Sequence, residues 1–130
     1  MVLASPPSNN RILIVDDDQE FARSLNKTLL KEGYEVNITP EKAIADKLFS
    51  SDYFPLILLD FQIHNKHGLQ LLKDIRTFSP KSRVIIFTVN DDTDMFKRAK
   101  SEGAYAILNK PVKRQTILRY ARAALKRHYS

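Results

Sequence analysis

Three carboxylates, one hydroxyl and one amine stand at or just beyond the ends of short aliphatic runs in this sequence. They are Asp16, Asp17, Asp60, Thr88 and Lys110. Carboxylate oxygens are the ligands that Mg²⁺ and Mn²⁺ prefer, and a cation held in this way usually takes a phosphoryl oxygen as a further ligand. An ammonium group and a hydroxyl can neutralise and hydrogen-bond the same phosphoryl group. These residue types therefore indicate phosphoryl chemistry with a divalent cation, Mg²⁺ or Mn²⁺.

Asp60 is the candidate nucleophile among these residues. Three carboxylates placed together repel one another and raise their own pKa values unless a cation joins them. The chain contains no Cys, and no Ser or Thr at these positions is paired with a base. A carboxylate can itself form a covalent aspartyl phosphate. We therefore expect Asp60 to accept the phosphoryl group, while Lys110 and the cation spread its charge.

The elements that must position these residues alternate between short apolar runs and amphipathic stretches, which is typical of βα units in a parallel sheet. The expected strands are residues 12–15, 34–38, 56–59, 84–87 and 104–108. The expected helices are residues 19–32, 40–49, a segment from Leu69 onwards, 93–102 and 114–128. Right-handed crossovers place helices on both faces of such a sheet. We expect an α/β, flavodoxin-like (βα)5 doubly wound fold with strand order 2-1-3-4-5, whose strands end along one ligand-binding edge.

Capping and turn residues set the expected limits of these elements. Asp18 is a candidate N-cap for the first helix, and Gly33 supplies the left-handed residue that commonly closes a helix. Thr39 followed by Pro40 resembles an N-cap followed by proline at the first helical position. The polar segment 62–68 is expected to be a loop.

Length and composition favour one domain. The chain has 130 residues, of which 43% are hydrophobic and 28% charged, which suits a single substantial core over residues 11–128 after a polar leader, residues 1–10. The leader lacks the pattern of a secretory signal, and no apolar run approaches the ~20 residues that cross a bilayer. The absence of Cys excludes cysteine-ligated metals, thiol nucleophiles and disulfide scaffolds, and it favours a reducing cytoplasm.

Charge is distributed unevenly along the chain. The net charge is +6, and residues 97–130 hold ten basic residues and one acid, whereas the remainder holds eleven basic and fourteen acidic residues. Arg119, Arg122 and Lys126 line one face of the last expected helix, and this face is either solvated or binds a partner. Because the last two expected helices are both basic, we expect a symmetric dimer through them to be absent or to depend on anions.

Four pieces of the sequence, in this order, resemble the receiver domain of two-component response regulators over residues 11 to about 126. They are residues 12–18, Leu58 to Asp60 with Gly68 eight residues on, Phe87 with Thr88, and Lys110 with Pro111. The resemblance implies a phosphorylation-switched signalling domain that takes a phosphoryl group onto Asp60 in a Mg²⁺-dependent reaction. The donor would be a sensor histidine kinase or a histidine phosphotransfer protein.

The resemblance also implies a role for each site residue. Asp17, Asp60 and the backbone carbonyl of Gln62 would ligate the metal directly, and Asp16 would act through a metal-bound water. Thr88 and Lys110 would bind the phosphoryl oxygens. The chain would be a phosphoacceptor domain that assists its own phosphorylation and dephosphorylation, rather than an ordinary enzyme. Its output to an effector domain or protein would pass through the surface formed by residues 93–102, 104–108 and 114–128.

The sequence departs from the family pattern at several positions. Ile63 and His64 stand where the family usually has Met-Pro, and Val89 stands where a small residue usually leaves room for the phosphoryl group. The switch aromatic that normally works with the threonine is replaced by Ile107, whereas Tyr105, two residues earlier, could face the same side of its strand. In the family, the positions of Gln62 and Asn90 tune hydrolysis of the aspartyl phosphate.

Other functions remain open from the sequence alone. A nucleic-acid-binding module could use the basic last helix, although the chain shows no recognisable reader motif. A metal-dependent phosphatase needs a general acid, and Gln62 stands where such enzymes commonly carry a second Asp. His64 and His67 have the spacing of two metal ligands but no third ligand, so we interpret both as loop residues.

Overall fold

The protein forms one five-stranded parallel sheet in the order β2-β1-β3-β4-β5. A computed structural model describes residues 10–40, 43–44, 53–61, 65–89 and 92–126. The strands are β1 Arg11–Val15, β2 Glu35–Thr39, β3 Leu56–Phe61, β4 Arg83–Thr88 and β5 Ala106–Asn109. The helices are α1 Gln19–Lys31, α3 Asn65–Phe78, α4 Thr93–Ser101 and α5 Arg114–Lys126. The predicted flavodoxin-like topology is confirmed.

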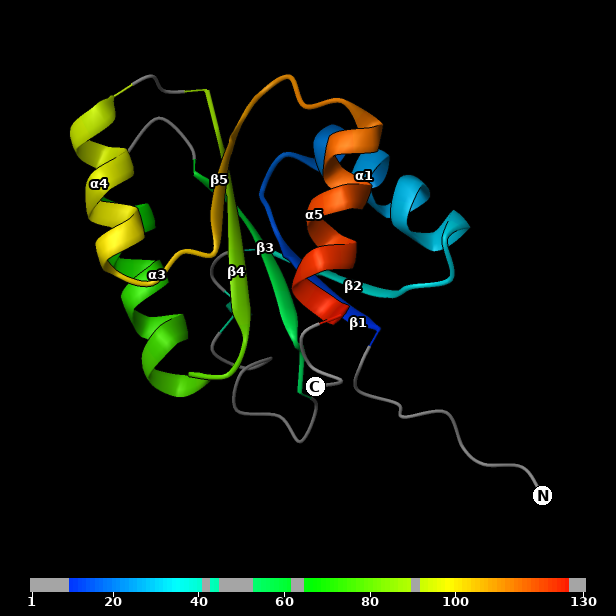
Figure 1. The fold of residues 1–130 in the computed structure, drawn as a ribbon, viewed down its shortest axis with the longest axis horizontal. Helices are drawn as coiled ribbons and strands as arrows, with labels where there is room; N and C mark the ends of the chain where they lie inside the picture. Colours follow the sequence, from blue (N-terminus) through cyan, green and yellow to red (C-terminus); the bar gives the residue numbers. More distant parts are fainter. Residues whose placement is uncertain (1–9, 41–42, 45–52, 62–64, 90–91, 127–130) are drawn as a thin grey trace.

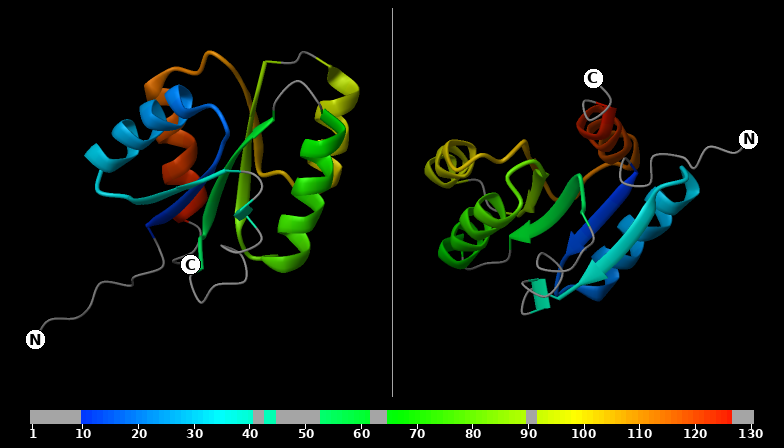
Figure 2. Two further views of the ribbon diagram at one scale, coloured as in Figure 1. Left: turned by 180° about the vertical axis from the view of Figure 1, so that it is seen from behind. Right: turned by 90° about the horizontal axis from the view of Figure 1, so that it is seen from below.

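Helices cover both faces of the sheet. Helices α1 and α5 lie on one face and α3 and α4 on the other (Figures 1 and 2). The expected helix over residues 40–49, the leader up to residue 9 and His128 lie outside the described residues. Asn10, the last residue of the expected leader, donates from Nδ2 to the Gly33 carbonyl at 3.1 Å and is therefore held against the domain. Within the described ranges, no helix has the length and apolar character to cross a membrane.

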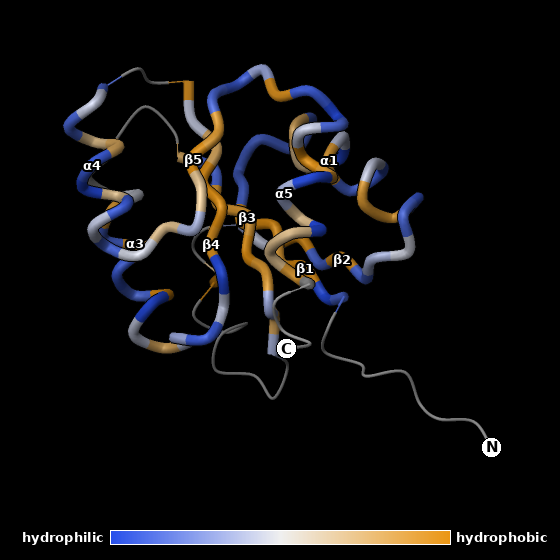
Figure 3. Tube along the Cα trace, viewed as in Figure 1, coloured by the Kyte–Doolittle hydropathy of each residue, from blue (hydrophilic) through white to orange (hydrophobic). Residues whose placement is uncertain are grey.

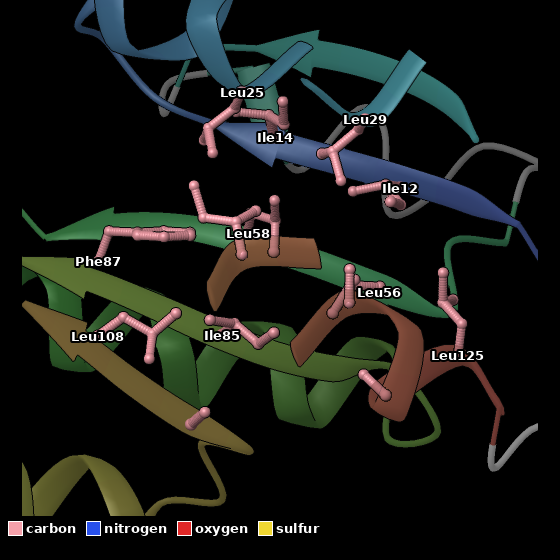
Figure 4. Close-up of a cluster of buried hydrophobic side chains, with 14 of the residues drawn as sticks. Ile12, Ile14, Leu25, Leu29, Leu56, Leu58, Ile85, Phe87, Leu108 and Leu125 are labelled. Atoms are coloured by element: carbon pink, nitrogen blue, oxygen red, sulfur yellow. The ribbon is translucent and has the colours of Figure 1, made fainter. Parts of the chain in front are cut away.

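Apolar side chains fill the space between the sheet and each helical layer. The central strands are hydrophobic along most of their length (Figure 3), as expected for strands buried on both faces. On the α1 and α5 face, Ile14, Leu58 and Phe87 belong to one cluster with Leu25 and Leu108 (Figure 4). This packing makes the sheet a rigid base for the loops at the ends of its strands.

Helix α1 begins as predicted, with Asp18 as its N-cap. The Asp18 Oδ1 atom accepts hydrogen bonds from the amides of Glu20 at 3.1 Å and Phe21 at 3.3 Å. At the other end, Gly33 adopts a φ of 88°, a conformation that favours glycine. The prediction of both ends from capping residues is confirmed, and the first turn of α1 is thereby fixed beside the end of β1.

The expected loop over 62–68 is wrong at its carboxyl end, because α3 already begins at Asn65. Gly68 therefore lies inside a helix, where it is normally unfavourable. A Cβ atom at this position would lie 2.8 Å from two ring carbons of Phe61. Glycine thus allows the first turns of α3 to pass close to the end of β3, and this packing requirement outweighs the loop-like composition.

Candidate functional site

An ion pair between Lys110 and Asp60 lies at the centre of the carboxyl edge of the sheet. The Lys110 Nζ atom is 2.7 Å from Asp60 Oδ1, and the two side chains are 17% and 4% exposed. Asp60 is the penultimate residue of β3, and Lys110 directly follows β5. Residues that are 50 positions apart in the chain are therefore brought together as the sequence predicts. The structure shows a carboxylate largely withdrawn from water and held by one cation.

The strand register explains how these residues meet. Val15 is paired with Leu59 and Phe87 with Asp60, so the chain continues from β1 and β4 on either side of Asp60. Thr88 lies opposite Asn109, and the amide of Lys110 donates to the Thr88 carbonyl at 2.8 Å. Asp60 and Thr88 lie within their strands rather than beyond them, because the ladder extends further than the aliphatic runs. Asp16, Asp60, Thr88 and Lys110 thus share one edge.

Asp16 carries the most strongly perturbed carboxyl group of this edge. Burial raises the pKa of Asp16 from 3.8 to about 7, an effect that neighbouring Asp60 strengthens and that the amide of Asp18 and the charge of Lys110 oppose. That amide donates to Asp16 Oδ1 at 2.7 Å. Asp16 Oδ2 is buried and has no hydrogen-bond partner among the described residues. A buried carboxylate oxygen without a partner needs either a proton or a cation.

The donor chemistry of this edge fits a small, hard divalent cation. The buried oxygen of Asp16 lies next to the carboxylate of Asp60, and both offer oxygen ligands. The described residues contain no group of three acidic or histidine side chains arranged to hold a metal ion. Asp17, the third expected carboxylate, directly follows Asp16 and is exposed. The ligand role of Asp17 stays a prediction, and Gln62 lies outside the described residues.

An open hollow lies beside the acidic part of the site. It has a volume of about 230 Å³ and is lined by Asp16, Gln19, Ala22, Arg23 and Ile38. Asp16 directly follows β1, and the other lining residues come from the start of α1 and the end of β2, so the hollow lies on the side of Asp16 away from β5 and Lys110. Ile38 is exposed there. The hollow thus adjoins the largely buried Asp16 side chain.

Thr88 and the two positions that depart from the family pattern differ in exposure. Thr88 is fully buried, whereas the adjacent Val89 is 64% exposed and stands at the surface beside the site. Ile107 is half-buried and packs with the cluster on the α3 and α4 face. The switch position therefore holds an aliphatic side chain that packs against the core. Its role in switching stays a prediction.

The possibility that Tyr105 shares a face with Ile107 is wrong. Tyr105 packs against the cluster on the α1 and α5 face, opposite to Ile107, and its ring lies under the guanidinium of Arg83 at 5.5 Å. The alternation of side chains begins only with the strand, and β5 starts at Ala106. Tyr105 precedes the strand, so the alternation of side chains along β5 does not determine the face on which its ring lies.

Sequence reasoning missed the aromatic side chain that contacts the lysine and the second ring packed behind it. The Lys110 Nζ atom lies 4.0 Å from the ring centroid of Phe21 in α1. The Phe21 ring in turn meets the ring of Phe87 edge to face, with centroids 5.3 Å apart and planes at 71°. The helical spacing marks Phe21 only as a residue of the apolar stripe. The position of Phe87 directly before Thr88 was the available signal that an aromatic group lies near the site.

Comparison with known proteins identifies a family and several relatives. The family model described as the response regulator receiver domain matches residues 12–122. The chain is 33% identical over 103 residues to sporulation initiation phosphotransferase F of Bacillus subtilis, covering 79% of this chain and 83% of the relative. Other curated relatives are longer, and the chain spans only 24% and 52% of the length of two of them.

Solved structures with the same fold include two response regulator proteins. One is a CheY-like receiver domain protein from Methanospirillum hungatei, with a TM-score of 0.83, 29% identity, and coverage of 92% of this chain and 96% of that one. The other, from Burkholderia pseudomallei, has a TM-score of 0.76, 27% identity, and coverage of 92% and 71%. It contains a phosphorylated aspartic acid, a calcium ion and citrate.

Proposed function

The chain belongs to the response regulator receiver domain family, and from that premise we propose that Asp60 is its phosphoryl acceptor. The observation that carries this proposal is the 2.7 Å ion pair between Lys110 and Asp60 at the carboxyl edge. The partly buried lysine lies where it can also contact a phosphoryl group carried by the Asp60 carboxylate. The phosphorylated aspartic acid in the Burkholderia pseudomallei relative supports the same chemistry.

The proposed reaction moves a phosphoryl group between two side chains. A carboxylate oxygen of Asp60 forms a new P–O bond while the P–N bond of a donor phosphohistidine breaks, and the imidazole keeps the bonding electron pair and takes a proton from water. Lys110 then neutralises charge on the phosphoryl oxygens, and Thr88 is the proposed hydroxyl donor. Hydrolysis of the acyl phosphate restores the Asp60 carboxylate and releases inorganic phosphate.

We assign the cation of this site to Mg²⁺, with Mn²⁺ as a substitute. Asp16, Asp17, Asp60 and the carbonyl of Gln62 are the proposed ligands, with Asp16 acting through water. When bound, the cation would neutralise the carboxylates and the incoming phosphoryl group. The buried Asp16 oxygen without a partner supports this assignment, because it gains a counter-charge on metal binding.

We further propose that the phosphoryl donor is a sensor histidine kinase or a histidine phosphotransfer protein in the cytoplasm. The output surface is proposed to be α4, β5 and α5, where an effector domain or protein would read the phosphorylated state. The exposed charged side chains of this surface are mainly basic, among them Lys97, Lys100, Arg119 and Arg122. We therefore expect no symmetric dimer through α4 and α5 at low salt. A well-populated dimer of this kind in sedimentation would contradict that expectation.

The acceptor is tested by intact-protein mass after incubation with Mg²⁺ and a small acyl phosphate. The wild-type chain should gain one phosphoryl group, and Asp60→Asn should gain none. Asp74→Asn is the matched control, because Asp74 is an exposed carboxylate of α3 that accepts a hydrogen bond from Gln70 and lies outside the site. A chelator should suppress the gain in wild type and control. A gain that survives Asp60→Asn would refute the acceptor.

The second candidate is a nucleic-acid-binding module. The observation in its favour is the exposed basic surface of α5, including Arg114, Arg119 and Arg122. Binding of this kind should weaken steeply as salt rises. Salt-dependent DNA binding by this chain that is unaffected by Asp60→Asn would favour the module over the phosphoacceptor.

A further inference from the structure

The ammonium group of Lys110 lies between two different partners. On one side is Asp60 Oδ1 at 2.7 Å, and on the other is the face of the Phe21 ring, whose centroid is 4.0 Å from Nζ. A cation within about 6 Å of a ring centroid is attracted by the negative face of the aromatic ring. Phe21 therefore contacts the very group that is proposed to receive the phosphoryl oxygens.

The Phe21 ring is itself held in place from two directions. Its backbone amide lies in the first turn of α1 and donates to Asp18 Oδ1 at 3.3 Å. Its ring packs edge to face on Phe87, which is 1% exposed and directly precedes Thr88. The ring thus has a fixed position relative to both the strand that carries Thr88 and the helix that follows Asp16 and Asp17.

An aromatic face suits a lysine that must change partner during a reaction. A carbonyl or carboxylate in place of the ring would occupy one of the three ammonium donors, whereas a π face attracts the charge without fixing the direction of any N–H bond. The long lysine side chain loses rotamer freedom when it is held, and the ring supplies part of the attraction that holds it. It also keeps water from that side of Nζ, which strengthens the remaining electrostatic interactions.

We propose that Phe21 is a positioning residue that holds the Lys110 ammonium over its ring, so that the three N–H donors stay available to Asp60 and to the phosphoryl group. This inference rests on the proposed function, because it concerns the same lysine. It goes further in assigning a role to a residue of α1.

The first experiment tests the contact itself and needs no phosphoryl donor. The ε-methylene protons of Lys110 should show an upfield ring-current shift in the NMR spectrum of the wild-type protein. The shift should be lost in Phe21→Leu and kept in Phe21→Tyr. Unshifted Lys110 protons in the wild-type spectrum would overturn the inference whether or not Asp60 is the acceptor.

The second experiment separates the π face from simple packing. Phe21 is replaced by difluoro- and pentafluoro-phenylalanine, which keep the shape of the ring while weakening its negative face, and the rate of phosphoryl gain from an acyl phosphate is followed by mass. The rate of phosphoryl gain should fall stepwise with fluorination, with a total fall of about fivefold. Phe21→Tyr, which keeps the negative ring face, should react at the wild-type rate. Thermal melting verifies that each variant is folded.

The outcomes distinguish this inference from the proposed function. If the wild-type chain gains no phosphoryl group, the proposed function fails, and the ring-current shift alone decides the position of Lys110. If the wild-type chain reacts and the fluorinated variants react at the same rate, Phe21 only packs, and the positioning role is refuted. A slow Phe21→Leu variant beside unaffected fluorinated variants refutes it in the same way.

Discussion

Two buried polar side chains, Ser82 at the amino edge of the sheet and Asp16 at the carboxyl edge, differ in how their hydrogen bonds are satisfied. At the amino edge, Ser82 is fully buried, and its hydroxyl donates to the Phe54 carbonyl at 2.5 Å and accepts from Ser79 at 2.6 Å. Arg76 donates to the carbonyls of Pro80 at 2.8 Å and Ser82 at 2.7 Å. At the carboxyl edge, Asp16 is buried with one oxygen lacking a partner and with a pKa raised to about 7.

This difference separates stability from function within one fold. Satisfied hydrogen bonds at the amino edge join the start of β3 to the start of β4 and stabilise the domain. At the carboxyl edge, the carboxylates of Asp16 and Asp60 repel each other, and one lysine offsets this repulsion only in part. Binding of a divalent cation, together with the phosphoryl group that it holds, would reduce the repulsion. The buried carboxylate oxygen without a partner thus marks the candidate site, whereas the hydrogen-bonded Ser82 marks a structural contact.

The largest expected effect is on the pH dependence of stability at the carboxyl edge. Because the pKa of Asp16 is raised from 3.8 to about 7, the folded protein holds this proton more tightly than the unfolded chain. Without a divalent cation, the free energy of unfolding should therefore fall as the pH rises through this window, by on the order of 1 kcal/mol per pH unit. Asp16→Asn should remove that slope, as measured by urea unfolding in chelator.

Two further observations decide the outcome of this comparison. Added Mg²⁺ should restore the stability of the wild-type chain near pH 7 and should change Asp16→Asn less, since the cation takes the place of the proton. If the free energy of unfolding has the same pH dependence in the wild-type chain and in Asp16→Asn, the pKa of Asp16 is not raised by folding. The contrast between Asp16 and Ser82 would then be refuted.

A smaller effect is expected when a bond is removed from the amino edge. Ser82→Ala leaves the Phe54 carbonyl and the Ser79 hydroxyl without their partner in a buried place. The free energy of unfolding should fall by about 2 kcal/mol, while the rate of Asp60 phosphorylation stays unchanged. Thr77→Ala is the control, because its hydroxyl is exposed and donates to the Lys73 carbonyl within the same helix. Loss of phosphorylation in a folded Ser82→Ala protein would contradict the separation of roles.

The smallest expected effect concerns how the carboxyl edge is packed beside Asp60. Gly68→Ala brings a Cβ atom to 2.8 Å from the Phe61 ring, which is 2% exposed and cannot easily move. Overpacking outweighs the gain in helix propensity, so we expect a net loss of about 1 kcal/mol in the free energy of unfolding. Phe61→Leu should reduce the cost of Gly68→Ala in a double-mutant cycle. Additive effects would show that the two residues are not in contact.

Much of this arrangement could be predicted from the sequence, because its strongest signals are physical. Continuous aliphatic runs mark strands buried on both faces, and the rule for parallel sheets then places Asp16, Asp60, Thr88 and Lys110 along one edge. Asp18 and Gly33 marked the ends of α1 because caps act through local backbone bonds. These inferences needed no side-chain contact.

The remainder depends on packing, which sequence patterns do not report. The start of α3 was missed because Gly68 indicates a loop in the sequence. In the structure a glycine is needed there inside the helix, since the ring of Phe61 in β3 leaves no room for a Cβ atom. The sequence left open that Tyr105 shares a face with Ile107, and it does not, because β5 and its alternation of side chains start one residue later, at Ala106. Phe21 resembled any other residue of an apolar stripe, and only the rotation of α1 over the sheet brings its ring to Lys110.

The most direct test of the central claim is to locate the phosphoryl group on the chain. After reaction with an acyl phosphate and Mg²⁺, borohydride reduction converts a phosphorylated aspartate to homoserine, and peptide mass spectrometry identifies the converted position. Conversion at Asp60 alone, absent without the donor, is the result that we predict. Conversion at Asp17 or elsewhere, with Asp60 unmodified, would contradict the account of the carboxyl edge.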